Sequence, residues 1–551
     1  MTALDFIAQT KAKIATLTEP DITAADLTNC DREPIHIPNA IQPHGVLLVL
    51  SPDNWTIVQA SQNTDVYLGH PVETLLGQSL AVLLSEAQVQ QIQACVERDF
   101  ESINPLTFEL VVNNVVETFL AVVHTSNGLV IVELEPGEVT ASASFFDFYS
   151  QVKRPIDRLQ RTQTLDELCQ VAVEEVRQIT GFDRVMVYRF APDGSGSVAA
   201  EAKKENLSPF LGLHYPPTDI PKQAKCLYLL NLLRLIPDVA YTPVPLMTNH
   251  EAPLDMSLAG LRSVSPLHTE YLVNMGVRAS MSISIICDQQ LWGLIACHHN
   301  SPRKLPYDVR TICEFLGQVI ALEMASRQDK EDAEDKIRLK TIQTEFVTAL
   351  TISNSLQQGL LDNGEKLLKL TSASGVAYCE QDHITLYGQT PTEGEVSQLI
   401  KWVAQQFDRE PGPIYHTMAL GQQYPPAANF RSAPSGLLAL AISKVQHLYI
   451  LWFRPEVIQT VRWAGNPSKP NEIDAEGNVR ISPRKSFALW QETVRQKSLS
   501  WKPWEVDAAA ELRSAIIGLV LKKADELAQV NSELERSNVE LDAFAYVASH
   551  D

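Results

Sequence analysis

The sequence predicts an α+β protein with three domains, each a central antiparallel sheet with flanking helices, joined by long spine helices and ending in a coiled-coil-like helix. The 551 residues are about three to four times a usual domain of roughly 100–200 residues. Short apolar runs of strand length occur in three clusters, each with helical stretches beside it. The longest helical stretch starts near Pro306 and becomes highly charged in its second half, which is typical of a helix between two domains.

The first domain is expected over residues 21–137, after a flexible arm at residues 1–20. The first thirty residues are polar and show no periodic pattern, which favours a mobile segment. From Gly45 the pattern becomes strand-like, continues with a helical stretch at residues 71–98, and closes with three apolar strands that end near Glu135. This order of strands, short helices and closing antiparallel strands indicates an α+β sensor domain.

The second domain is expected over residues 138–326 and the third over residues 327–520. The second domain opens with two helices, and Gly181 is predicted to end the later one before the strand RVMVYRF. After a long Pro-rich loop come two strong strand signals, ASMSISIIC and QLWGLIACHH. The third domain contains a Trp-, Pro- and Gly-bearing insertion at about residues 455–495, and an insertion of that length is uncommon without a function.

The last residues, 521–551, are predicted to continue one long helix that starts near Trp504. Its seam positions recur with 3-4 spacing and include one polar residue: Leu527, Val530, Leu534, Ser537, Leu541, Phe544 and Ala548. This spacing is the seam of a coiled coil, so we expect the helix to dimerise. The alternative is that the same face packs on its own domain.

Composition and charge exclude several classes of function. Lys and Arg total 45 against 66 Asp and Glu, and the net charge of −21 disfavours binding to nucleic-acid phosphates or an anionic membrane surface. No run of about 18 apolar residues indicates a membrane span, and the N-terminus lacks a secretory signal, so a cytoplasmic location is expected. The eight cysteines occur singly without CxxC pairs, so neither a metal site nor a disulfide framework is predicted.

No catalytic motif is present, whereas the second domain gathers residues suited to binding. Sequences of the types GxxxxGK(S/T), HExxH and GxSxG are absent. Arginines bind carboxylates bidentately and aromatic faces enclose a π-system, so this mixture of side chains suits a flat, extended, partly anionic ligand. The candidate residues are His214, Tyr215, Asp219, Tyr228, Arg234, Arg262, Ser265, His268, Tyr271, Ser280, Ser282 and His298.

Three motifs of the second domain resemble a known photoreceptor family. The string LHYPPTDIPKQAKCLYL resembles the phytochrome signature around Asp219, Ile220 and Pro221. The strings RSVSPLHTEYLVNMGVRASMSISI and LWGLIACHH resemble the rest of the bilin-binding GAF domain of that family. The three predicted domains also fit the phytochrome order of PAS, GAF and PHY, so the resemblance covers residues from about 20 to 520.

The resemblance implies a linear tetrapyrrole that is attached by a thioether to one cysteine. Plant-type members carry this cysteine immediately before His268, where the present chain has Leu267. Bacteriophytochromes carry it in the N-terminal arm, and Cys30 in NCDREPIHIPNAIQPHG matches that position. The neighbouring Asp31 disfavours a thiolate, so the assignment of biliverdin to Cys30 rests on the resemblance and not on local chemistry.

The resemblance also assigns roles to residues of the pocket. Asp219 and His268 are expected to face the pyrrole nitrogens, because a protonated bilin is a buried cation that needs acceptors. Arg234 and Arg262 are expected to anchor the propionates. The other implied residues are Ser265, Ser280 and Ser282 beside the propionates, Tyr188, Tyr215, Tyr228 and Phe210 around the D-ring, His298 at the D-ring carbonyl, and Tyr271, Ile220 and Pro221 as further pocket residues.

The insertion of the third domain resembles the tongue of the PHY domain. One half of it carries Trp463, and the other carries Pro483, Arg484 and Ser486. Arg484 is expected to pair with Asp219 and to seal the pocket. Removing one partner of such a nearly buried pair would cost about 3–5 kcal/mol.

The function implied by the resemblance is that of a red/far-red photoreceptor of bacteriophytochrome type, which photoconverts by Z/E isomerisation of the bilin D-ring. The final string, LDAFAYVASHD, is similar to the start of a histidine kinase dimerisation helix with His550 as the phosphoacceptor. No ATP-binding domain follows in this sequence, so the chain itself is not expected to be an enzyme. The full-length protein is expected to be a light-regulated sensor histidine kinase of a two-component system.

The implied partners are a second copy of the chain and a response regulator. The homodimer is expected to form through the GAF and PHY spine helices and the C-terminal helices. Neither nucleic acid nor a membrane is expected as a partner. The alternative function is a GAF/PAS sensor that binds a diffusible small molecule, such as a cyclic nucleotide, without photochemistry.

Overall fold

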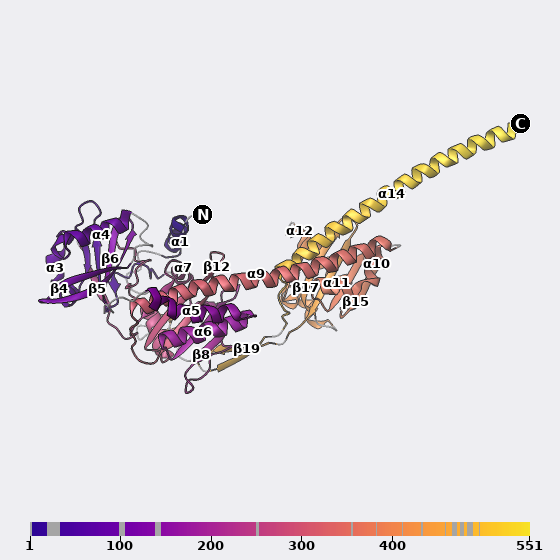
Figure 1. The fold of residues 1–551 in the computed structure, drawn as a ribbon. Helices are drawn as coiled ribbons and strands as arrows, with labels where there is room; N and C mark the ends of the chain where they lie inside the picture. The colour runs from indigo at the N-terminus through magenta and orange to yellow at the C-terminus, as the bar shows by residue number, and fades with distance from the viewer. Residues whose placement is uncertain are drawn as a thin grey trace. The chain divides into compact units, whose positions relative to one another are not determined.

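The structure is a computed structural model that divides into two compact units (Figure 1). The first unit comprises residues 1–328 and 462–491, and the second comprises residues 329–461 and 492–551. The residues that the structure describes are 3–18, 33–97, 105–137, 145–248, 253–353, 356–381, 383–409, 412–430, 434–457, 459–465, 471–473, 479–481, 487, 489–494 and 496–550. Each unit contains at least one mainly antiparallel sheet of its own.

The N-terminal sheet of the first unit has seven strands in the order β1-β11-β3-β2-β6-β5-β4. All of these pairings are antiparallel. Three short helices share one apolar core with the sheet, in which Phe108 and Phe119 are fully buried. The elements are β1 (Ala40–Ile41), β2 (Val46–Leu50), β3 (Ile57–Ser61), β4 (Leu106–Val112), β5 (Val115–Ser126), β6 (Leu129–Pro136), β11 (Val244–Thr248), α2 (Thr64–Leu68), α3 (Val72–Leu75) and α4 (Glu86–Glu97).

The second sheet of the first unit has the order β10-β12-β13-β7-β8-β9-β19-β22. Alternate residues of its strands face opposite sides, as the two-residue period of a strand requires. Val185 and Val187 pack on the core formed with helices α5, α6 and α9, whereas Met186 and Tyr188 belong to the cluster on the other side. The strands are β7 (Arg184–Phe190), β8 (Gly196–Lys203), β9 (His214–Tyr215), β10 (Leu233–Ile236), β12 (Ala279–Cys287), β13 (Gln290–His299), β19 (Gln459–Ala464) and β22 (Leu489–Val494).

Several helices surround this sheet, and the ends of α6 show clear capping chemistry. These are α5 (Phe145–Arg161), α6 (Leu165–Thr180), the single-turn 3-10 helix η4 (Pro217–Asp219), α7 (Lys222–Leu230), α8 (Pro266–Asn274) and α9 (Tyr307–Ile352). Helix α6 starts with a capping box in which Thr164 and Glu167 satisfy each other's backbone N–H groups. It ends at Gly181, whose φ of 64° lies in the left-handed region that glycine adopts without strain.

The N-terminal segment differs from the flexible arm that the sequence predicts. Residues Ala3–Leu17 form helix α1, which packs on α7 through Ile14, Cys226 and Leu227. Thr10, Ile14 and Thr18 are all buried, and their spacing places them on one face of a helix. Two of these three are polar, which explains why the sequence shows no apolar periodicity.

A strand pair and two further backbone hydrogen bonds join the first sheet to the second domain. Together they hold the chain around Ala40 in place. Strand β1 pairs with β11, which lies in the second domain by sequence. Beside it, the backbone N–H of Gln42 donates to the carbonyl of Leu261 at 2.7 Å, and that of Ser263 donates to Ala40 at 2.9 Å. The residues just before Ala40 are thereby held next to the segment that carries Arg262.

The second unit has a five-stranded antiparallel sheet in the order β15-β14-β18-β17-β16. Trp452 is fully buried in it and donates its indole N–H to the carbonyl of Leu367 at 3.0 Å. The elements are α10 (Leu356–Asp362), α11 (Gly364–Leu370), β14 (Gly375–Glu380), β15 (His383–Gly388), α12 (Glu393–Arg409), β16 (Ile414–Thr417), α13 (Leu420–Gln423), β17 (Pro434–Ser443), β18 (Leu448–Pro455) and α14 (Pro503–His550). A two-stranded antiparallel sheet, which belongs to the first unit, consists of β20 (Asn471–Ile473) and β21 (Val479–Ile481).

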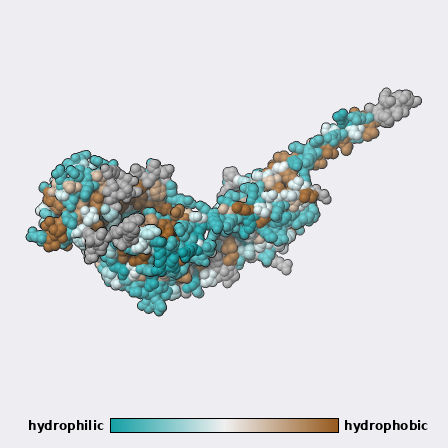
Figure 2. Space-filling view, viewed as in Figure 1, coloured by the Kyte–Doolittle hydropathy of each residue, from teal (hydrophilic) through white to brown (hydrophobic). Residues whose placement is uncertain are grey.

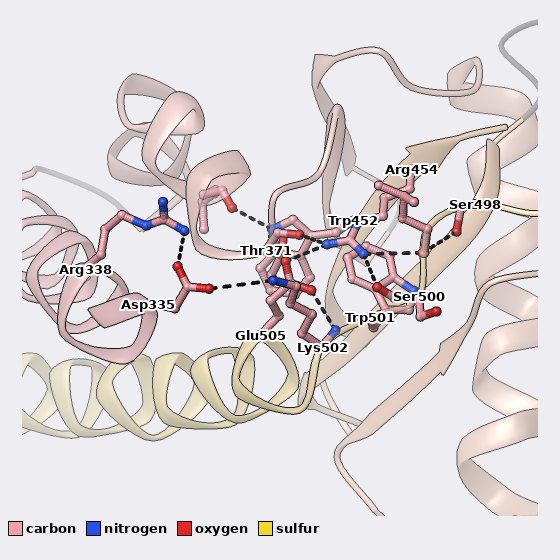
Figure 3. Close-up of polar contacts among 12 residues, drawn as sticks. Asp335, Arg338, Thr371, Trp452, Arg454, Ser498, Ser500, Trp501, Lys502 and Glu505 are labelled. Atoms are coloured by element: carbon pink, nitrogen blue, oxygen red, sulfur yellow. Dashed lines mark hydrogen bonds and ion pairs between the residues drawn. The ribbon is translucent and has the colours of Figure 1, made fainter. Parts of the chain in front are cut away.

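A buried cluster around Arg454 holds the start of α14 to the end of β18 (Figure 3). The guanidinium donates to Glu505 Oε1 at 2.6 Å, to the carbonyl of Thr371 at 2.6 Å and to that of Ser500 at 2.7 Å. It also lies 3.9 Å from the ring centroid of Trp501. Helix α14 is therefore tied, at its first turn, to the chain that enters and leaves the insertion of this domain.

The predicted fold class is confirmed, with one long helix replaced by shorter ones. The α+β architecture and the antiparallel sheets are present, and QLWGLIACHH forms β13 over the same ten residues. The stretch at residues 71–98, by contrast, is broken into α3, a 3-10 turn and α4. Gly77, with a φ of 82°, lies where the continuous helix would have run, and this left-handed backbone interrupts it.

Candidate ligand-binding pocket

A cavity of about 230 Å³ lies in the second domain between the sheet and helices α7 and α8. Strands β7, β8, β10, β12 and β13 supply part of its wall, and the 3-10 turn η4 supplies another part. The residues predicted from the sequence that line it are Tyr188, Tyr215, Asp219, Ile220, Pro221, Tyr228, Arg234, Arg262, Ser265, His268, Tyr271, Ser280, Ser282 and His298. Side chains from distant parts of the sequence thus meet in a single cavity, as the convergence of residue types predicts.

The strand register explains why polar side chains line one side of the cavity. Ser282 lies opposite Arg234 in the antiparallel pair β10–β12, and Ser280 lies opposite His298 in the pair β12–β13. Ser280 and Ser282 are two residues apart, so both point to the same face. The hydroxyl of Tyr228 is hydrogen-bonded to the side chain of Ser282.

The two arginines of the cavity have different hydrogen-bond environments. Arg234 donates Nη1 to the carbonyls of Ala259 and Gly260 at 3.0 and 2.9 Å, and Nη2 to that of Arg262. Arg262 is 7% exposed, and its Nε and Nη1 have no hydrogen-bond partner among the described residues. Burial lowers the pKa of Arg262 to about 9, and the nearby charge of Arg234 adds to this shift. Arg262 therefore presents charged donors in the cavity, and an anionic group would satisfy them.

Asp219 and Tyr271 form a polar pair in the wall of the same cavity. The Tyr271 hydroxyl donates to Asp219 Oδ2 at 3.2 Å. The ring of His268 is stacked on Tyr271, with centroids 6.3 Å apart and an interplanar angle of 11°. Phe487 contacts the same tyrosine edge to face at 5.1 Å. Tyr271, expected only as a further pocket residue, thus links Asp219, His268 and the insertion of the third domain.

His298 is buried and His268 is partly buried, and the loss of solvation keeps both imidazoles neutral at pH 7. Burial lowers the pKa of His268 to about 4, with a further contribution from Arg234. Burial lowers the pKa of His298 to about 3, and the charges of Arg184 and His268 act in the same direction. Nδ1 of His298 is buried and has no hydrogen-bond partner in the part of the chain that the structure describes. This nitrogen can donate to or accept from a polar group of a ligand.

Tyrosine side chains form an aromatic wall on the sheet. The ring of Tyr188 lies 5.6 Å from that of Tyr215 and 5.3 Å from that of Phe190. Phe210, which we expected in this wall, is not among the residues that line the cavity. The guanidinium of Arg184 lies 3.6 Å from its ring centroid, and the backbone N–H of Phe210 donates to Glu201. These contacts hold Phe210 beside the tyrosine cluster but outside the cavity.

Sequence reasoning missed several residues of the cavity, including Glu33, Met186 and Val198. Glu33 Oε2 accepts a hydrogen bond from the Ser265 hydroxyl at 2.8 Å, and burial raises the pKa of its carboxyl group. Ser265 therefore binds a carboxylate of the chain and also caps α8 through the N–H of Leu267 at 3.2 Å. The position of Glu33 in the motif that contains Cys30 is the signal that could have identified it.

The tongue residues are described only in part. Trp463 lies in β19, which pairs in parallel with β9 at His214, and the two rings are 6.0 Å apart. Cys30, Pro483, Arg484 and Ser486 lie outside the described residues. The side chain of His550 is likewise outside them, although its backbone ends α14. The thioether at Cys30 and the pairing of Arg484 with Asp219 therefore remain predictions.

Comparisons with known proteins match nearly the whole chain. Family models match as a PAS fold at residues 30–137, a GAF domain at residues 164–327 and the phytochrome region PHY at residues 339–525. Cyanobacterial phytochrome B of Nostoc sp. is 52% identical, over 96% of this chain and 70% of its own length. The bacteriophytochrome of Pseudomonas aeruginosa is 34% identical, over 93% of this chain and 69% of its own length.

A solved structure agrees with these matches. The photosensory core module of the Stigmatella aurantiaca phytochrome has a TM-score of 0.80 and 43% identity, and the match covers 90% of this chain and 99% of that one. The chain belongs to the phytochrome family. The PAS, GAF and PHY domains expected from the sequence are confirmed, and together they form a phytochrome photosensory module.

The residues of the cavity fit the bilin chromophore that phytochromes bind. A bilin has propionate groups, and Arg262 supplies two buried donors that lack a partner in the described chain. It is also a flat π-system with polar ring edges, and the cavity combines tyrosine rings with the buried Nδ1 of His298. The phytochrome has no helix, in the ranges that the structure describes, with enough length and apolar character to span a bilayer.

Proposed function

We propose that this phytochrome is a red/far-red photoreceptor that binds biliverdin covalently at Cys30 and converts between two states by D-ring Z/E isomerisation. The observation that carries the proposal is the buried cavity in which the Nε and Nη1 donors of Arg262 lack a partner among the described residues. A buried cationic donor without a partner costs free energy unless a ligand satisfies it. Leu267 occupies the position of the plant-type cysteine, which supports attachment from the arm.

The proposed roles of the pocket residues follow from their positions. Arg262 and Arg234, with Ser280 and Ser282, would hold the propionates. The main-chain carbonyl of Asp219 and the ring of His268 would face the pyrrole nitrogens. The carboxylate of Asp219 already accepts from Tyr271 at 3.2 Å, so Arg484 would share or replace that donor.

The residues at the other end of the pocket would surround the D-ring. Bound biliverdin supplies the light absorption and the isomerisation about its C–D bridge. Tyr188, Tyr215 and Tyr228 would enclose the space around this ring, and His298 would hydrogen-bond its carbonyl through one ring nitrogen. Because burial keeps His298 neutral, with its pKa lowered to about 3, the imidazole can respond to a change in the ring's position without changing its charge.

The output proposed for the whole protein is a histidine kinase. A break of the contact between Asp219 and Arg484 would change the tongue, and helices α9 and α14 would carry the change to His550, the proposed phosphoacceptor. The whole protein would act as a homodimer and pass phosphate to a response regulator. In physical terms this is a two-state equilibrium that light shifts.

The test of covalent attachment uses the chain co-expressed with a source of biliverdin. We expect a coloured protein whose bilin stays on the polypeptide under denaturing conditions and fluoresces with zinc. Cys30→Ala should abolish that fluorescent band but leave bilin bound in the native protein, because the arginines remain. Cys226→Ala is a matched control, since burial raises the pKa of that thiol. A band that persists in Cys30→Ala would place the attachment at another cysteine.

A further inference from the structure

The rings of Tyr188, Phe190 and Tyr215 form an aromatic shelf on the sheet, and Gly196 lies at its centre. Gly196 of β8 lies opposite Phe190 of β7 and opposite Tyr215 of β9 in the antiparallel register. Tyr188 is two residues before Phe190 and therefore points to the same face of the sheet. Its ring packs against Phe190 on one side, at 5.3 Å, and against Tyr215 on the other, at 5.6 Å.

The ring of Tyr188 occupies the space that a side chain at position 196 would need. A Cβ atom on Gly196 would overlap Cζ, Cε1 and Oη of Tyr188, far inside the 3.0 Å that real Cβ atoms keep. Unlike Gly194, whose φ is 87°, Gly196 has no left-handed φ that would itself require glycine. Glycine is therefore needed at this position because the tyrosine ring leaves no room for a side chain.

The surroundings limit where a displaced ring could go. Phe190 and Tyr215 flank the ring, and the backbone of β8 lies beneath it. Tyr188 also lines the cavity of about 230 Å³, which offers open space next to the ring. A methyl group at position 196 would thus push the phenol toward the space for the ligand, because packed interiors leave few other voids.

We propose that Gly196 is a positioning residue that seats Tyr188 in the pocket wall and so sets the room available to the bilin ring beside it. The part that concerns bilin rests on the proposed function. The shelf also joins the pocket to the tongue: Tyr215 follows His214, with which Trp463 of β19 pairs. Tyr188 and Ala464 belong to one apolar cluster, so a shift of the phenol would reach that strand.

Gly293 shows why the effect is specific to Gly196. A Cβ atom on Gly293 would meet the backbone carbonyl of Tyr188, which cannot move without breaking the pairing of β7 and β13. At Gly196 the obstacle is the far end of a side chain, which can rotate. Gly196→Ala should therefore leave the sheet intact and move the phenol.

The first test uses the protein without chromophore. The chain is labelled with fluorotyrosine, and the ¹⁹F resonance of Tyr188 is identified by its loss in Tyr188→Phe. Gly196→Ala should shift this resonance, whereas Gly394→Ala should not, because a Cβ at Gly394 meets no atom within 4 Å. An unchanged Tyr188 resonance in folded Gly196→Ala would overturn the proposal whatever the chromophore does.

The second test uses the biliverdin-loaded chain. Gly196→Ala should still attach bilin, because Cys30 and both arginines are unchanged, but its photoconversion rate under equal red illumination should change by about threefold or more. The change should be much smaller between Tyr188→Ala and the double variant Tyr188→Ala/Gly196→Ala, in which no ring remains to be displaced. Equal effects of Gly196→Ala in both backgrounds would contradict the proposal that Gly196 positions Tyr188.

Two further outcomes keep the tests separate. If Gly196→Ala fails to fold, the double variant with Tyr188→Ala should fold, and its failure would show that the glycine is needed for another reason. If the unsubstituted chain binds bilin but does not photoconvert, the proposed function fails. The ¹⁹F result then still decides whether Gly196 positions Tyr188.

Discussion

Replacing either arginine of the pocket should change the stability of the ligand-free protein, and the two changes should have opposite signs. Arg262 is buried, with two donors that have no partner among the described residues, whereas Arg234 donates to three backbone carbonyls. Arg262→Met should raise the free energy of unfolding of the ligand-free protein by about 1–3 kcal/mol, because it removes an incompletely satisfied buried charge. Arg234→Met should lower it by about as much, since those carbonyls lose their charged donor.

The substitution of Arg262 that should stabilise the ligand-free protein should also weaken ligand binding. In a Cys30→Ala background, Arg262→Met should weaken non-covalent biliverdin binding at least about tenfold, through loss of charge-assisted hydrogen bonds. Urea denaturation and biliverdin titration measure the two effects. If the Arg262→Met variant is less stable without ligand and still binds biliverdin normally, the side chain has a structural role instead.

The buried histidines predict that the ligand-free protein loses stability in acid. Burial lowers the pKa of His268 to about 4 and that of His298 to about 3, whereas an unfolded histidine has a pKa of about 6.5. Below pH 6.5 the unfolded chain binds more protons. The free energy of unfolding should therefore fall by about 1.4 kcal/mol per pH unit for each histidine, down to about pH 4 and pH 3 respectively.

Neutral replacements test the histidine effect. His268→Gln and His298→Gln should each flatten the dependence of urea midpoints on pH between 6.5 and 4, because glutamine does not titrate. Exposed His447 provides a control, and His447→Gln should leave the slope unchanged. A slope that both pocket variants retain would assign the acid sensitivity to other groups.

At the scale of elements, the cluster around Arg454 should stabilise the first turn of α14. Arg454 and Glu505 have side chains only 7% and 4% exposed. Arg454→Met should cost about 3–5 kcal/mol, because it strands the carboxylate of Glu505. Lys340→Met breaks an ion pair to Glu511 whose side chains are 66% and 53% exposed, and it should cost less than about 1 kcal/mol.

Hydrogen exchange locates the effect of the Arg454 cluster. The amides at the start of α14 should exchange faster in Arg454→Met than in Lys340→Met, because the turn loses its attachment to β18. Glu505→Gln should cost less than Arg454→Met, since a neutral amide can still accept from the guanidinium. Equal exchange in Arg454→Met and Lys340→Met would show that the cluster does not hold the helix.

Elements with strong periodicity could be predicted from the sequence, whereas those shaped by tertiary contacts could not. The strand β13 follows from its apolar composition, and the end of α6 follows from Gly181. Helix α1 was missed because Thr10 and Thr18 share its buried face with Ile14. Within the pocket, residue types and the family motif identified the lining. No local pattern shows that Arg184 covers the ring of Phe210, because those residues are far apart in the sequence.

At the scale of the whole molecule, the seam on α14 predicts a dimer. In Figure 1 this helix continues beyond the sheet of its own unit, and Figure 2 shows hydrophobic side chains exposed along it. Four seam residues are exposed in the single chain: Leu527 by 64%, Val530 by 54%, Leu534 by 58% and Leu541 by 61%. This exposure is expected for a coiled-coil seam that is covered by the helix of a second copy. The alternative, that this face packs on its own domain, does not hold for these four residues in the described chain.

Sedimentation tests the dimer. Leu527→Glu/Leu534→Glu should weaken self-association at least about tenfold, because each charge would lie in the seam. Ser532→Glu adds a charge on the opposite face of the helix and should leave association unchanged. A double variant that remains as dimeric as the parent would place the interface on other elements.

The proposed function requires that light switch this chain between two states through a bilin held in the GAF pocket. The most direct measurement is the absorption spectrum of the biliverdin-loaded chain in the dark, after red light and after far-red light. We expect two distinct spectra that interconvert repeatedly and reversibly with the two illuminations. A spectrum that neither illumination changes, in a chain that carries stoichiometric bilin, would contradict the proposed function.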